Sequence, residues 1–449
     1  MEDRRLATES AAAESEAKLS GEIAKRVAAG LNKAPEEVTE EEEAAVTELD
    51  LSRMELKDLA FLERFPLLEN LSIAGAPVQD LAPLRKLARL WKLDLSGVPA
   101  TDLSPLQDLP ALRKLNLTST PVTDLAFVRY VPQLDELYLM NTSIADLAPL
   151  EKLVHLKGLN LHGMRVSDIR PLSRLIELEK LELTRTRVED LSPLQKLPRL
   201  QGLYLGATPV GDLTPLQDLP SLEILVLTST PVSDLAPIRG LSKLRVLLAN
   251  ETAVADLEPL KGLSALQTLI LNFTRITDLA PLSGLTELRE LAISRTEVSD
   301  IAPLHGLTAL VKLALNSTKV TDLSPLKGLS RLEDLMLVEA PVTDLSPLAG
   351  APALKNLYLN ATPVSDLSPL KDTPHLRSLH LRKSRVTDLA PLAGHPTLSM
   401  LDLAETALTD LKPLQSLPRL RMVDVSAIQA TPEEVQSLKA ACPKLSVIR

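Results

Sequence analysis

The stretch Ser317–Leu329, STKVTDLSPLKGL, recurs in nearly the same letters along most of the chain. With Asp322 as the marker, seventeen consecutive copies hold an Asp at this position, spaced 22 residues apart without insertion or deletion. The markers are Asp58, Asp80, Asp102, Asp124, Asp146, Asp168, Asp190, Asp212, Asp234, Asp256, Asp278, Asp300, Asp322, Asp344, Asp366, Asp388 and Asp410. A period of this length predicts a solenoid, because one repeat cannot bury its leucines without copies on either side.

The repeat unit is L-x-x-L-x-L-x-x-T-x-V-x-D-L-x-P-L-x-x-L-x-x. Its first half resembles the leucine-rich repeat signature, and its length and D-L-x-P-L tail resemble the internalin-type subclass of bacterial leucine-rich repeat proteins. The resemblance covers residues 46–428. It implies an α/β fold: a right-handed solenoid with a concave parallel β-sheet, a convex side of short 3-10 or irregular turns, and helical caps at both ends. Such arrays serve many unrelated partners, so the resemblance is specific for fold rather than for function.

The polar residues that recur in each repeat are predicted to form the turns. Asp side chains accept hydrogen bonds from nearby backbone N–H groups. A Ser–Pro pair such as Ser324–Pro325 suits the start of a short 3-10 turn, with Ser as the cap and Pro at the first helical position. Eleven repeats, from Thr120 to Thr406, carry Thr where the family commonly has a bonded Asn. A Thr hydroxyl could form a shorter version of that inter-repeat ladder.

The chain is predicted to have four parts: a tail (1–19) that is disordered or forms a frayed helix, a helical N-terminal cap (20–45), the array of seventeen repeats (46–428) and a helix-plus-strand C-terminal cap (429–449). A solenoid needs polar caps over its open ends. Thr39 with Glu42, and Thr431 with Glu434, have the spacing of capping boxes, which predicts a helix start at each end of the chain.

Composition narrows the class of function. Of 449 residues 45% are hydrophobic but only 2% aromatic, and the net charge of −10 argues against a general nucleic-acid binder. The only cysteine, Cys442, can form neither an internal disulfide nor a cysteine-rich metal site, which favours a reducing compartment. The start lacks the apolar segment of a signal peptide, and no apolar run of about 18 residues occurs. We expect a cytoplasmic protein without membrane insertion, and export by a non-classical route stays open.

Catalytic signatures are absent from the sequence. It contains no phosphate-binding glycine loop, zinc-ligand spacing or nucleophile elbow. His162 and His380 are ten repeats apart, or roughly 48 Å, so they cannot share a site. We therefore predict no enzyme activity, no catalytic residues, no cofactor and no metal, and interpret the Asp column as turn-forming rather than as a calcium ladder. His380, Arg382, Lys383 and Asp402 could bind an anion together, but a solvated charged face is favoured.

The strand positions that point outward lie ten, eight and six residues before each marker Asp. At minus eight the chain is polar near both ends and apolar throughout the middle, from Tyr204 to Tyr358, a span of about 34 Å. Val, Ile and Tyr also favour exposed strands, but residues placed for that reason would be scattered. A contiguous apolar surface with a polar margin is typical of a partner-binding face. The predicted partner-binding residues are Tyr204, Ile224, Val226, Val246, Leu248, Ile270, Phe273, Met336, Val338 and Tyr358, with a secondary spot at Tyr138 and Met140.

These patterns predict a non-catalytic scaffold that recognises a protein partner on its concave face. The partner's identity is open; nucleic acid is not expected, and the chain is predicted to be a monomer or a weak homodimer. Two alternatives remain. The internalin resemblance implies a secreted, host-directed effector, and a glycan- or lipid-binding solenoid is a different class, which the scarcity of aromatic residues disfavours.

Overall fold

The computed structural model describes residues 20–428, 431–442 and 444–448. The tail 1–19, for which the sequence predicts disorder or a frayed helix, lies outside the described residues, as does the start of the predicted C-terminal cap at 429–430. The chain divides after Pro209 into two compact units, Met1–Pro209 (unit 1) and Val210–Arg449 (unit 2).

The described part of unit 1 starts with a helical segment at 20–31, followed by the 3-10 turn η1 (Pro35–Glu37) and helix α2 (Glu40–Ala44). Its strands are β1 (Glu48–Asp50), β2 (Asn70–Ser72), β3 (Lys92–Asp94), β4 (Lys114–Asn116), β5 (Glu136–Tyr138), β6 (Gly158–Asn160), β7 (Lys180–Glu182) and β8 (Gly202–Tyr204). The 3-10 turns between them are η2 (Ala60–Arg64), η3 (Ala82–Lys86), η4 (Ser104–Asp108), η5 (Ala126–Tyr130), η6 (Ala148–Lys152), η7 (Arg170–Arg174) and η8 (Ser192–Leu194).

Unit 2 continues the pattern and closes with helix α3 (Pro432–Ala441) and strand β19 (Ser446–Ile448). Its other strands are β9 (Ile224–Val226), β10 (Val246–Leu248), β11 (Thr268–Ile270), β12 (Glu290–Ala292), β13 (Lys312–Ala314), β14 (Asp334–Met336), β15 (Asn356–Tyr358), β16 (Ser378–His380), β17 (Met400–Asp402) and β18 (Met422–Asp424). Its 3-10 turns are η9 (Thr214–Leu216), η10 (Ala236–Ile238), η11 (Glu258–Leu260), η12 (Ala280–Leu282), η13 (Ala302–Leu304), η14 (Ser324–Leu326), η15 (Ser346–Leu348), η16 (Ser368–Leu370), η17 (Ala390–Leu392) and η18 (Lys412–Ser416).

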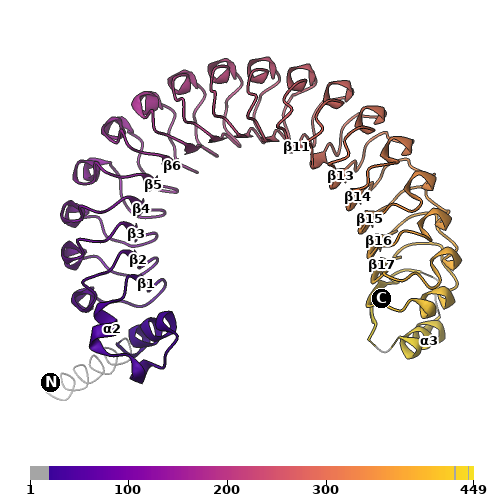
Figure 1. Ribbon diagram of the computed structural model, residues 1–449, viewed down its shortest axis with the longest axis horizontal. Helices are drawn as coiled ribbons and strands as arrows, with labels where there is room; N and C mark the ends of the chain where they lie inside the picture. Colours follow the sequence, from indigo (N-terminus) through magenta and orange to yellow (C-terminus); the bar gives the residue numbers. More distant parts are fainter. Residues whose placement is uncertain (1–19, 429–430, 443, 449) are drawn as a thin grey trace. The chain divides into compact units, whose positions relative to one another are not determined.

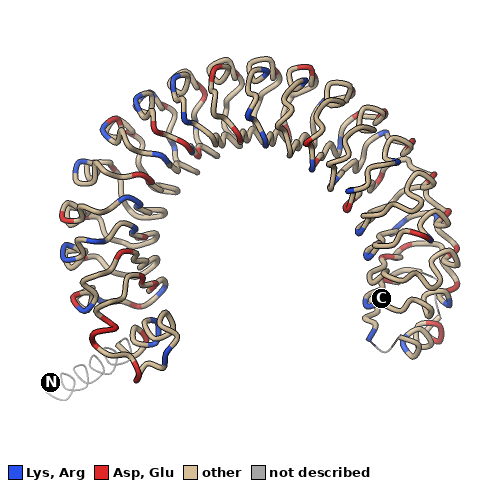
Figure 2. Tube along the Cα trace, in the orientation of Figure 1, with Lys and Arg blue, Asp and Glu red and all other residues tan. Residues whose placement is uncertain are grey.

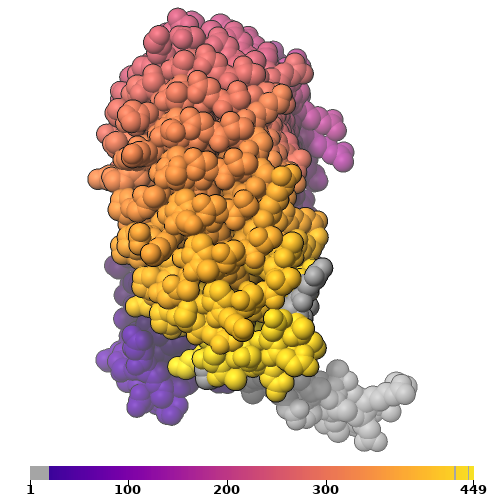
Figure 3. All heavy atoms as spheres, turned by 90° about the vertical axis from the view of Figure 1, so that its right-hand side faces the viewer, coloured from indigo at the N-terminus to yellow at the C-terminus, as the bar shows by residue number. Residues whose placement is uncertain are grey.

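Within each unit, the strands form a parallel sheet on the concave side and the 3-10 turns form the convex side (Figure 1). Successive repeats pair in register, as Leu291 with Leu313 and Leu313 with Leu335. The middle residue of each three-residue strand points inward; Leu313, for example, is fully buried, while Lys312 and Ala314 on either side face outward. Figure 3 shows the repeats of unit 2 following one another from orange to yellow. The predicted leucine-rich repeat fold is confirmed.

The Asp column has the turn-forming role that the sequence predicts. In each of the seventeen repeats the carboxylate accepts the backbone N–H two residues later. In the opening stretch, Ser324 N donates to Asp322 Oδ1 at 2.8 Å. The assignment of Ser as the helix cap is wrong, because Leu323 occupies the cap position and Ser324 is the first residue of the turn. The side chain that accepts a backbone N–H at the start of the turn is therefore that of Asp, and not that of Ser as the sequence interpretation proposed.

The Thr column does not form a ladder between repeats. Each of its eleven hydroxyls donates to the carbonyl three residues earlier in its own repeat, as Thr252 Oγ1 does to Ala249 O at 2.8 Å. These Thr side chains are buried. The hydroxyl is too short to reach the next repeat and instead closes the turn that follows its own strand.

The capping boxes predicted at both ends are present. Thr39 accepts the N–H of Glu42 at the start of α2, and the side chain of Glu42 accepts the N–H of Thr39. Thr431 and Glu434 make the same pair of bonds at the start of α3. None of the helices in the described part of the chain has the length and apolar character needed to cross a bilayer.

Candidate interaction surface

Apolar side chains form an unbroken column on the outward side of the sheet in unit 2. Register places Val226, Leu248, Ile270, Ala292, Ala314, Met336 and Tyr358 side by side on consecutive strands. Ile224 and Val246, which also pair with each other, widen the column at β9 and β10. Together these nine residues are called the apolar strand face. All are half-buried except Ala292, which is 9% exposed.

Several other predicted contact residues lie outside this column. Val338 follows β14 and is half-buried beside Met336. Phe273 lies in the turn after β11, with a φ of 58°, 52% exposure and the guanidinium of Arg295 5.3 Å from its ring centroid. Tyr204 lies on β8 in unit 1, where the ammonium of Lys180 stands 5.2 Å from its ring centroid. Tyr204 is therefore treated apart from the apolar strand face of unit 2.

The carboxylate and amide side chains at the minus-eight strand positions of unit 1 cap their own backbone. At minus eight, Asp50, Asp94, Asn116, Asn160 and Glu182 each accept the N–H two residues later. Asp402 and Asp424 do the same at the end of unit 2. An apolar residue at minus eight cannot supply this acceptor, so the apolar strand face requires another partner for the N–H at minus six.

For Ile270, Ala292, Ala314 and Met336 that partner comes from the previous repeat. Asn272 N donates to Asn250 Oδ1 at 3.0 Å, and Ser294 N donates to Asn272 Oδ1 at 2.7 Å. The same pattern continues as Asn316 N to Ser294 Oγ, Val338 N to Asn316 Oδ1 and Arg382 N to Asn360 Oδ1. We call this series the asparagine ladder. The inter-repeat bonding that the sequence predicts for the Thr column is thus made by side chains at minus six.

The apolar strand face ends at a stacked aromatic pair. The rings of Tyr358 and His380 lie 4.5 Å apart and nearly parallel, and His380 Nε2 is 2.8 Å from Ser378 Oγ. Burial lowers the pKa of His380, and the carboxylate of Asp402 opposes that shift only in part. At neutral pH the imidazole is therefore neutral and can extend the apolar column by one strand.

The charged cluster after His380 is neutralised internally. The guanidinium of Arg382 lies 3.5 Å from Asp402, 3.4 Å from Glu405 and 3.2 Å from Asp424. Lys383 is 3.2 Å from Glu405. With carboxylates already around Arg382, the solvated charged face that the sequence favours fits this cluster better than an anion site does.

Unit 1 carries the secondary spot. Tyr138 is 38% exposed, and its hydroxyl donates to Glu136 Oε2 at 2.7 Å. Burial, together with the Glu136 carboxylate, raises the pKa of Tyr138 to about 12. Tyr138 and Glu136 line a pocket of about 260 Å³ with Lys92, Lys114 and other strand residues. Met140 is half-buried in the following turn and does not line this pocket.

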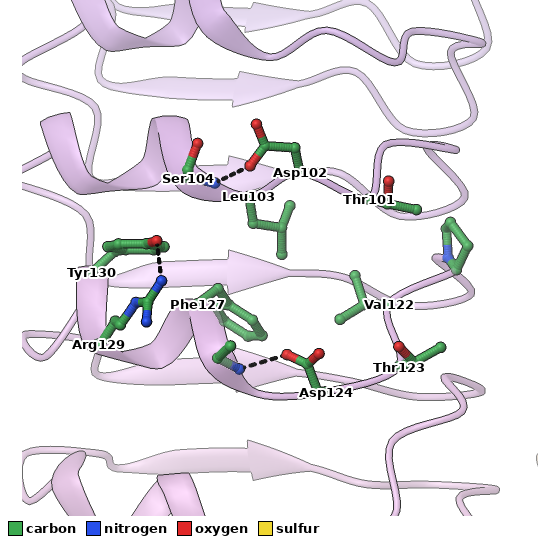
Figure 4. Close-up of a pocket in the computed structure, with 12 residues that line it drawn as sticks. Thr101, Asp102, Leu103, Ser104, Val122, Thr123, Asp124, Phe127, Arg129 and Tyr130 are labelled. Atoms are coloured by element: carbon green, nitrogen blue, oxygen red, sulfur yellow. Dashed lines mark hydrogen bonds between the residues drawn. The ribbon is translucent and has the colours of Figure 1, made fainter.

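The turn side of unit 1 has a second hollow, of about 250 Å³, between two successive turns (Figure 4). Its carboxylates, Asp102 and Asp124, are bonded to backbone N–H groups of the turns, and Arg129 donates to the hydroxyl of Tyr130 at 2.6 Å. The lining contains no histidine, lysine or cysteine. In the described part of the chain no group of three or more His, Cys, Asp or Glu side chains could hold a metal ion.

No protein-family model matches the chain, and no curated protein matches it. Solved structures do. An internalin from Listeria monocytogenes is 26% identical over 84% of this chain and 94% of its own, with a TM-score of 0.55. A leucine-rich repeat protein of Leptospira interrogans is 21% identical over 88% and 99%, with a TM-score of 0.73. The plant peptide hormone receptor RGFR1, solved in complex with RGF2, is 16% identical over 92% and 76%, with a TM-score of 0.66.

Proposed function

Because the chain is an internalin-like leucine-rich repeat protein, we propose that it is a non-catalytic scaffold that binds a protein partner on the apolar strand face of unit 2. Solved proteins of this fold include receptors, one of them a peptide hormone receptor in a complex. The proposed contacts are the nine residues of the face, with Val338 and Phe273 at its margin and Tyr204 as a separate contact on unit 1.

The asparagine ladder is the observation that carries this proposal. Placing Ile270 or Met336 at minus eight removes an acceptor that the polar repeats supply from their own side chain. Unit 2 restores the lost bond with Asn250, Asn272 and Asn316 from neighbouring repeats. In the middle of the apolar strand face, the apolar residue at minus eight is therefore accompanied by a matching change in the backbone bonding.

The same ladder indicates what the partner presents. Each Asn in it uses Oδ1 as an acceptor, which fixes the orientation of the amide and leaves the two N–H donors of Nδ2. Within the described residues, no acceptor is bonded to Nδ2 of Asn250, Asn272 or Asn316. A partner segment with apolar side chains can cover the strand face while its backbone carbonyls accept from these amides. This combination suits an extended peptide segment.

Selection of a random-peptide library tests the proposal without knowledge of the natural partner. We expect the wild-type protein to enrich peptides rich in apolar residues, and the variant Leu248→Glu plus Ile270→Glu to enrich none of them. The matched control is Thr286→Glu plus Thr308→Glu, which places the same charges on exposed positions outside the strands. The proposal fails if the strand variant binds the selected peptides as tightly as the control does while both melt like the wild type.

A secreted or surface-exposed effector is the second candidate, favoured by the structural likeness to an internalin. The first candidate keeps the cytoplasmic location expected from the sequence. Fractionation of the source cells with an antibody against the chain separates the two, because recovery of the protein in the medium or on the cell surface favours the effector.

A further inference from the structure

Four cations gather around one hollow at the C-terminal end of unit 2. Arg377, Arg419, Arg421 and Lys444 line a pocket of about 490 Å³ whose lining contains no carboxylate. Blue segments mark Lys and Arg positions beside this end of the chain in Figure 2. We propose that this basic pocket binds a phosphoryl group carried by a protein segment. The proposal goes beyond recognition at the apolar strand face and involves none of its residues.

Strand register brings these side chains together from separate repeats. Arg377 directly precedes β16 and Arg421 directly precedes β18, so one strand separates them and their backbones are roughly 10 Å apart. Lys444 comes from the segment before β19, which pairs with β18. Long cationic side chains from these positions can converge on one anion.

Two hydroxyl groups in the lining of the pocket bond to backbone carbonyls of the preceding repeat. Ser399 lies between the two arginine positions, and its Oγ donates to the carbonyl of Arg377 at 3.0 Å. Thr397 Oγ1 donates to the carbonyl of Leu376 at 2.8 Å. These bonds join successive repeats and use the hydroxyl hydrogens, so the groups left to bind a ligand are the four cations.

Two other cations of the same column in unit 2 are paired with carboxylates. Arg245 lies 3.7 Å from Glu223, and Lys355 lies 2.6 Å from Glu333, each from one repeat to the next. The four cations of the basic pocket form no ion pair with any side chain in the described part of the chain. Like charges held together raise the free energy of the free protein, and a bound anion relieves that repulsion.

The positive charge of the four side chains, and the small size of the pocket that they line, favour a phosphoryl group as the ligand. A phosphorylated side chain carries about −1.5 to −2 charges and three acceptor oxygens, which match several cations better than one carboxylate does. Arginine forks bind phosphate oxygens in pairs. A nucleic acid would need a continuous basic track, whereas the same column carries Glu333 only two repeats before Arg377. The pocket therefore suits one isolated dianion.

Binding of three fluorescent peptides that differ at a single residue tests this assignment. We expect the phosphoserine peptide to bind at least tenfold more tightly than the glutamate peptide, with no detectable binding of the serine peptide. Equal affinity for the glutamate and phosphoserine peptides would overturn the assignment to phosphate, as would stronger binding of a single-stranded oligonucleotide. No binding of the phosphoserine peptide at low salt would overturn the site itself.

The chain offers a closely matched pair of variants. Arg419→Ala plus Arg421→Ala removes two cations from the pocket, and Arg289→Ala plus Arg331→Ala removes two from the same repeat positions outside it. All four arginines are exposed. We expect at least a tenfold loss of phosphopeptide affinity in the pocket variant and less than a twofold change in the control. Equal losses in both would show a general charge effect and contradict the site. Binding to the apolar strand face should be unchanged in both variants.

Discussion

Replacing Asn272 by Ala should lower stability by the free energy that one hydrogen bond of the asparagine ladder contributes. The change removes the Oδ1 that accepts the N–H of Ser294 at 2.7 Å, while the N–H of residue 272 keeps its bond to Asn250 at 3.0 Å. One half-buried backbone donor is left without its partner, which costs about 1–3 kcal/mol. A loss of 1.4 kcal/mol corresponds to about tenfold in an equilibrium constant.

Two further variants isolate that bond. Asn272→Ser should keep most of the stability, because Ser294 already performs this role for Asn316 N with its Oγ at 3.2 Å. Ala292→Asn, added to Asn272→Ala, should restore stability, since Asn116 at the equivalent position accepts the N–H of Thr118 in its own repeat at 2.9 Å.

The assay is hydrogen–deuterium exchange at residue 294, read by mass spectrometry, because a repeat array can open locally before it unfolds as a whole. Exchange should be about tenfold or more faster in Asn272→Ala than in the wild type, and close to the wild type in Asn272→Ser. Equal exchange rates in the Ala and Ser variants would refute the reasoning, because a lost acceptor could not then be the cause.

Three further predictions concern single side chains. Hydrogen bonds from Arg170 lower the pKa of Asp168 to about 2. The ionised carboxylate therefore stabilises the fold above pH 3.8, and this contribution is lost as the pH falls toward 2. In urea titrations, the stability difference between the wild type and Asp168→Asn should shrink over that range. Leu269→Ala, at a fully buried position, should cost about 2–5 kcal/mol, measured from the urea midpoint, and a cost below about 0.5 kcal/mol would contradict its place in the core. Glu136→Gln should lower the pKa of Tyr138 from about 12 toward 10, followed by phenolate absorbance; an unchanged titration would show that Glu136 contributes nothing.

The fold could be predicted from the sequence because each repeat buries the same residue types at the same positions against its neighbours. Leu313 pairs with Leu291 and Leu335 at a constant spacing, so a period of 22 residues already implies parallel register. The Asp turns were equally predictable, since an acceptor two residues before a turn is a local arrangement that the sequence shows directly. Local bonding also fixed the two capping boxes.

The sequence did not reveal contacts between repeats that depend on side-chain reach. Thr252 closes its own turn, whereas Asn250 bridges to the next repeat, and only geometry distinguishes these two roles. The basic pocket was missed for a similar reason. Arg377 and Lys444 are far apart in the sequence, and no local pattern shows that three successive strand pairings bring them to one edge.

A photo-crosslinking residue placed at 248 or 270 reports whether a natural partner touches the apolar strand face. We expect covalent complexes with one partner protein from both positions in cells that carry the gene, and none from the exposed turn positions 286 and 308. Complexes that form from 286 or 308 but from neither 248 nor 270 would mean that the strands only build the scaffold and that recognition lies elsewhere.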